Sequence, residues 1–115
     1  MPKFITIGYG DREGYDCTPK PLRDAAHAQD DKMRRSGALM GIAGTPVQVR
    51  NHEAQHLQTE VGPYMTSKLP VAGFAVIEAP TMEEAIRMVS QVPCAVAYGV
   101  VEVWPLEQAT EAPVA

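Results

Sequence analysis

Short segments in which hydrophobic residues are β-branched or aromatic predict the strands of this chain. Residues 3–9 (KFITIGY) have this character and end before Gly10-Asp11, as a strand followed by a turn does. Residues 71–79 form a longer apolar run that is typical of a buried strand. Further strands are expected at residues 38–42, 47–50, 56–61 and 97–104, with Gly- and Pro-rich loops at 10–21 and 62–70.

Two segments have the spacing of amphipathic helices. Residues 20–36 place Leu22, Ala26 and Met33 on one face, and Gly37 is a natural stop. Thr18 is the expected N-cap, with a proline at the first helical position. The second helix begins after Thr81, which forms a capping box with Glu84, and ends before Pro93.

The order of these elements predicts an α+β fold of the ferredoxin-like βαββαβ type with an extra hairpin. Both helices then cover one sheet face. Residues 71–79 are apolar at both odd and even positions, which indicates that the second face is covered too. We therefore expect a homodimer in which two sheets pack face to face.

The composition narrows the functional classes. A chain of 115 residues forms one domain, which we place at residues 1–106, followed by a flexible tail at 107–115. The net charge of −4 argues against nucleic acid as a partner, and no apolar run approaches the ~20 residues of a membrane span. Cys17 and Cys94 are far apart in sequence, so we expect reduced thiols and a cytoplasmic protein.

Residues 52–56 (HEAQH) match the HExxH pattern of zinc hydrolases. On an α-helix this spacing places two imidazoles on one face with a glutamate as general base. The flanking segments alternate with period two, which favours a hairpin turn instead. Zinc hydrolysis through His52, Glu53 and His56 stays open as an alternative, although we expect neither a metal nor another cofactor.

Several segments, in order, resemble the DGPF-motif branch of the YCII-related family. They are residues 61–68 (VGPYMTSK), 72–79 (AGFAVIEA), 83–85 (EEA) and 101–106 (VEVWPL). In the first half, His27, Met33-Arg34, Gly37 and Gly41 match the spacing of that branch. The resemblance covers residues 3–106 and implies a dimeric α+β barrel. Most members of this family have no assigned activity, and some relatives resemble enzymes that use a His-Asp pair.

The chain departs from the family pattern around the expected cleft. The motif carboxylate is replaced by Val61 and the motif phenylalanine by Tyr64. The loop glutamate is Thr66, the arginine of the last strand is Trp104, and Asp30 stands where the first helix carries an aromatic residue. We expect Asp30 to substitute for the carboxylate that is missing at Val61.

His27 and Asp30 are the candidate catalytic residues. On a helix, His27 can meet Asp30 at i+3, and a carboxylate partner orients the ring and raises its basicity. The alternative is an ordinary surface helix with ion pairs. Arg50, Tyr64 and Lys68 are expected to bind an anionic group at the cleft mouth, and Tyr9 to line the sheet face.

These features predict a YCII-related protein with a small-molecule ligand. The reaction we expect is a cofactor-independent lyase or isomerase step on a small organic compound, with aromatic compounds included, and with His27 as base. The alternative from a different class is a non-catalytic ligand-binding or accessory module, in which the lost motif carboxylate reflects absent chemistry.

Overall fold

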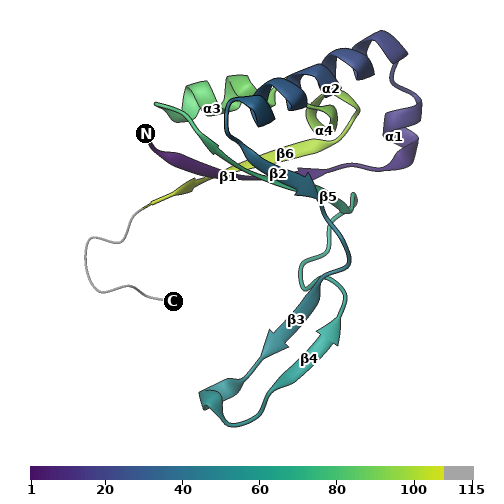
Figure 1. Cartoon of the computed structure of the whole chain (residues 1–115). Helices are drawn as coiled ribbons and strands as arrows, with labels where there is room; N and C mark the ends of the chain where they lie inside the picture. The colour runs from purple at the N-terminus through teal and green to yellow at the C-terminus, as the bar shows by residue number, and fades with distance from the viewer. Residues whose placement is uncertain (108–115) are drawn as a thin grey trace.

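The computed structural model describes residues 1–107 as an α+β fold with a four-stranded antiparallel sheet and a separate two-stranded hairpin (Figure 1). The sheet consists of β1 (Lys3–Tyr9), β2 (Leu39–Ile42), β5 (Val71–Glu78) and β6 (Val100–Leu106), in the order β2-β5-β1-β6. The hairpin consists of β3 (Val47–Arg50) and β4 (Gln58–Val61). The strands expected from the sequence are thus confirmed, although β2, β4 and β6 begin one, two and three residues later than expected.

The helices lie on one face of the sheet (Figure 1). They are α1 (Arg12–Asp16), α2 (Lys20–Arg35), α3 (Met82–Val89) and α4 (Pro93–Val96). The core between helices and sheet contains Phe4, Met33, Ile77 and Val89, all of which are buried. Within residues 1–107, none of the helices has the length and apolar character needed to cross a bilayer.

Three sequence-based expectations about the helices are wrong. Residues 10–21 are not only loop, because α1 begins there after Asp11, whose side chain accepts a hydrogen bond from the Gly14 amide. Thr18 does not cap α2: it is buried, and its hydroxyl donates to the Gly14 carbonyl at 2.8 Å. Pro19 is the N-cap residue instead.

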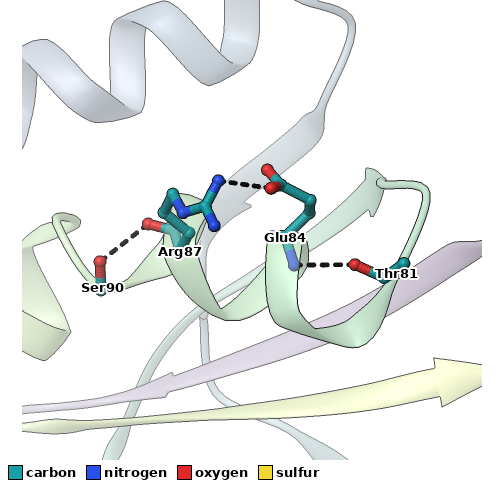
Figure 2. A network of polar contacts seen from close by, with 4 residues as sticks. All are labelled: Thr81, Glu84, Arg87 and Ser90. Atoms are coloured by element: carbon teal, nitrogen blue, oxygen red, sulfur yellow. Dashed lines mark hydrogen bonds and ion pairs between the residues drawn. The ribbon is translucent and has the colours of Figure 1, made fainter.

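Proline 93 begins a helix rather than ending one. The helix α3 already ends at Val89, and Pro93 is the first residue of α4, where its missing amide proton costs nothing. Figure 2 shows the polar contacts that hold α3: Thr81 accepts from the Glu84 amide at 3.1 Å, and the Glu84 carboxylate pairs with Arg87. Ser90 closes the helix by donating to the Arg87 carbonyl at 2.7 Å.

The second face of the sheet bears no element of the described chain (Figure 1). The exposed fractions of Phe74, Trp104 and Leu39, all on this face by strand register, are 50%, 53% and 76%. We call it the open face.

The tail expected at 107–115 lies outside the described residues except for Glu107, which is exposed.

Candidate functional site

A pocket of about 820 Å³ lies on the helix side of the sheet. This volume is in the range of about 300–1,000 Å³ that small-molecule sites occupy. Strands β1 and β5 contribute its floor, α2 one wall, α4 one end and the α1 region the other. The lining residues that carry the argument are Gly8, Arg12, Tyr15, His27, Asp30, Arg34 and Cys94.

His27 reaches this pocket from α2 and is held by Tyr15. The Tyr15 hydroxyl lies 2.8 Å from His27 Nε2, and the two rings meet edge to face with centroids 5.8 Å apart. The guanidinium of Arg23 covers the Tyr15 ring, with Cζ 4.9 Å from its centroid. The imidazole therefore has a defined orientation at the pocket wall, as a proton-transfer group requires.

Asp30 lines the same pocket less than one turn after His27 and is half-buried. Burial raises the pKa of its carboxyl, because the loss of water outweighs the attraction of His27 and Arg34. No hydrogen bond joins Asp30 to His27 in the described part of the chain. The ring is oriented by Tyr15 in this structure, so the orienting role expected for Asp30 stays a prediction.

Cys94 forms the end of the pocket near Asp30. Its pKa is raised by burial first and by the negative charge of Asp30 second. The thiol lies directly over Gly8 of β1: a Cβ at that position would be 2.9 Å from the sulfur. Only a residue without a side chain leaves room for this approach.

The pocket has positive charge near His27 that the sequence analysis did not identify. Arg12 of α1 and Arg34 of α2 both line it. Each is exposed and has a surface partner, since Arg12 lies 3.8 Å from Asp16 and Arg34 3.1 Å from Asp31. Screened surface pairs of this kind are weak, so either guanidinium can turn to an anionic ligand.

Tyr15 and Arg12 were missed because both lie in the segment expected to be a loop. A signal for α1 was present in residues 11–16 (DREGYD): an aspartate cap is followed by an arginine and an aspartate at i,i+4 spacing. The sequence pointed to Arg34 only as part of the family resemblance and as an ion-pair partner on a surface helix.

The other predicted substrate-binding residues do not line this pocket. Tyr9 belongs to the open face, where its hydroxyl donates to the Glu102 carboxylate at 2.6 Å and this bond raises its pKa. Arg50 and Tyr64 border a smaller hollow beside the hairpin, with the Arg50 Cζ 5.7 Å from the Tyr64 ring centroid. Lys68 is exposed in the loop that follows. Within one chain, then, the structure brings together His27 and Asp30 but separates them from these four.

The HEAQH segment lies at the tip of the hairpin, as its flanks predicted. Residues His52–Ala54 form a single 3-10 turn, in which Glu53 and Ala54 have φ of 56° and 59°. This backbone does not give the α-helical spacing that the zinc motif needs. Across residues 1–107 there is no group of three His, Cys, Asp or Glu side chains placed to hold a metal ion.

Val61, also on the hairpin, is 74% exposed and is not a pocket residue.

Comparison with known proteins identifies no family for this chain. No family model matches it, and no curated protein matches it either. Its function has to be inferred from the chemistry of the pocket.

Proposed function

We propose that the chain is a cofactor-independent lyase or isomerase that acts in the pocket beside α2. Its substrate is a small organic acid, and this class includes aromatic acids. The observation that carries this proposal is that His27 and Asp30 line one largely apolar cavity while Tyr15 holds the imidazole. An imidazole and a carboxyl group that face the same cavity are a common basis of proton-transfer catalysis.

In this reaction His27 takes a proton from a carbon of the ligand. The C–H bonding pair forms a new double bond, and the leaving group departs from the adjacent carbon with its own pair. In an isomerisation no group departs: the electron pair of an adjacent double bond moves to its far carbon, which takes a proton from Asp30. Burial raises the pKa of Asp30, so its carboxylate binds the proton that it returns more tightly than an ordinary aspartate does.

The substrate class follows from the charges around the cavity. Arg12 and Arg34 line the pocket, and a guanidinium binds a carboxylate with two parallel hydrogen bonds. The ligand therefore presents its anionic group to an arginine and its apolar part to the floor of the pocket.

We further propose that the fold is the ferredoxin-like one of the YCII-related family and that the protein is a homodimer. The strand order β2-β5-β1-β6, in which the first and third strands of the βαββαβ series are central, supports the fold. The exposed apolar side chains of the open face support the dimer. Cys17 and Cys94 are both free thiols, which supports a reducing, cytoplasmic setting.

Solvent deuterium exchange tests the enzymatic proposal without knowledge of the product. A panel of small aromatic and aliphatic carboxylates is incubated with the protein in D₂O, and NMR reports both binding and loss of carbon-bound protons. We expect at least one compound to bind and to exchange. His27→Gln and Asp30→Asn should lower its exchange rate at least tenfold.

The matched control is His52→Gln at the hairpin tip, with a chelator added in parallel. Neither the substitution nor the chelator should change the exchange rate. If both abolished exchange, the result would instead support the zinc hydrolase. Binding without exchange would overturn the enzymatic proposal in favour of a ligand-binding module, and no binding at all would overturn both.

A further inference from the structure

The hairpin formed by β3, the turn at its tip and β4, residues 47–61, has one apolar and one polar face. We call it the arm. Strand pairing places Val47 opposite Val61 and Val49 opposite Thr59 on one face. The opposite face bears Gln48, Arg50, Gln58 and Glu60. The exposed fractions of Val49 and Val61 are 66% and 74%, so the apolar face is uncovered.

The arm does not pack against the body of its own chain. The most extensive contacts of β3 and of β4 are with each other. A two-stranded hairpin alone is at best marginally stable in water and needs a third element on its apolar face. Within residues 1–107 nothing supplies that element.

The accessible surface area of the chain is larger than a compact protein of its mass has, as expected if an apolar surface lacks its partner. A compact protein of 12.5 kDa has an accessible surface of about 6,200 Å², whereas this chain has 8645 Å². Residues 108–115 can account for at most about 1,100 Å² of this excess, by the area of a fully exposed chain. The remainder exceeds the roughly 800 Å² that one partner buries in a stable complex.

The position of the arm indicates on which side its cover lies. It leaves the sheet after β2, returns before β5, and extends on the side away from the helices, which is the side of the open face (Figure 1). From Val47 to Asn51, just before the turn at its tip, it has five residues and a reach of roughly 16 Å at 3.3 Å per residue. Packed sheets are only about 10 Å apart, so an arm on this side extends past the first layer of a partner packed there.

We propose that the arm clasps a second copy of this chain, with its Val47, Val49 and Val61 face against the partner. This inference rests on the homodimer proposed above. The two arms are then exchanged, and each covers apolar surface that the open faces alone leave exposed.

Photo-crosslinking and equilibrium association test the arm directly. A benzoylphenylalanine at Val49 should give a covalent species of twice the chain mass, with crosslinked peptides from a second copy, whereas the same group at Gln58 on the polar face should not. Val49→Asp should weaken the dimer at least tenfold in sedimentation equilibrium. The matched control, Gln58→Asp, introduces the same charge at an exposed position of the same hairpin and should leave the association constant within twofold.

The outcomes separate the arm from the dimer. If the wild type is a dimer but V49D and Q58D associate equally well, or crosslinks from Val49 stay within one chain, the clasp is overturned while the homodimer stands. A wild type that sediments as a monomer at every accessible concentration overturns both. Circular dichroism of V49D verifies that the sheet and helices remain folded.

Discussion

The hydroxyl of Tyr15 lies 2.8 Å from Nε2 of His27, so that a residue on α1 determines the orientation of a ring on α2. The two side chains come from helices that only a short turn separates. Arg23, one turn before His27, covers the other side of the tyrosine. The proposed base is thus supported by a local cluster of α1 and α2 side chains, of which Tyr15 and His27 themselves line the pocket.

Removal of the hydroxyl in Tyr15→Phe should free the imidazole while leaving the aromatic contact. Because the hydrogen bond is exposed, we expect a loss of only about 0.5 kcal/mol in the free energy of unfolding. The ¹⁵N chemical shifts of the His27 ring should change, because the bond at Nε2 biases the tautomer. Unchanged imidazole shifts in Y15F would show that the bond does not orient the ring in solution.

The half-buried carboxyl of Asp30 should make the protein less stable as the pH rises. Burial raises its pKa in the folded state, so the folded protein binds this proton more tightly than the unfolded chain. The stabilisation is fully present below the ordinary pKa of an aspartate and is lost as the pH passes through the raised value. Asp30→Asn should therefore raise the free energy of unfolding at pH 7, by at most about 1 kcal/mol because the group is half-exposed.

Urea unfolding at pH 3 and pH 7 checks this prediction. The advantage of D30N should vanish at the lower pH, where the wild-type carboxyl is protonated. Asp31→Asn on the same helix is the control: Asp31 pairs with Arg34 at the surface, so its loss should leave stability unchanged or slightly lower. A D30N protein that is less stable than the wild type at pH 7 would mean that the ionised carboxylate has a stabilising partner.

The same charge should govern the reactivity of Cys94. Burial and the negative charge of Asp30 both raise the pKa of its thiol, and the thiolate is the reactive form. At pH 8, iodoacetamide should label the exposed Cys17 before Cys94, as followed by peptide mass spectrometry. Asp30→Asn should speed the labelling of Cys94 about two- to threefold and leave Cys17 unchanged; equal rates for Cys94 in both proteins would contradict the electrostatic coupling.

Much of the fold was predictable because its elements have local signals. The strand Lys3–Tyr9 was located to the residue by its β-branched run, and α3 by Thr81, whose cap the structure confirms. Pro93 misled because proline is equally suited to follow one helix and to begin the next. Sequence position alone does not distinguish these two roles.

The site was less predictable because it depends on contacts between elements. His27 and Asp30 share a helix, so their common pocket follows from i+3 spacing. Arg50 and Tyr64 were expected at the same cleft, but the direction in which the arm leaves the sheet decides their place, and no residue pattern encodes that direction. The Tyr15 contact depends on α1, whose single cap is a weak signal in a segment with two glycines.

Gly8 and Cys94 offer the sharpest test of how the pocket is built. A Cβ on Gly8 would lie 2.9 Å from the Cys94 sulfur and 3.3 Å from its Cβ, closer than unstrained contacts allow. Gly8→Ala should therefore cost about 1–3 kcal/mol in the free energy of unfolding, as overpacking does. Cys94→Ala removes the sulfur, so the double variant G8A/C94A should recover much of this loss, and the double-mutant cycle should show a coupling above 0.5 kcal/mol. Gly41→Ala is the matched control, because Gly41 is a strand glycine of the same sheet, in β2, with nothing within 4 Å of an added Cβ, and should be neutral or gain up to about 0.5 kcal/mol. If G8A were as stable as the wild type, Cys94 would not rest against β1, and the closed end of the pocket would be open to a longer ligand.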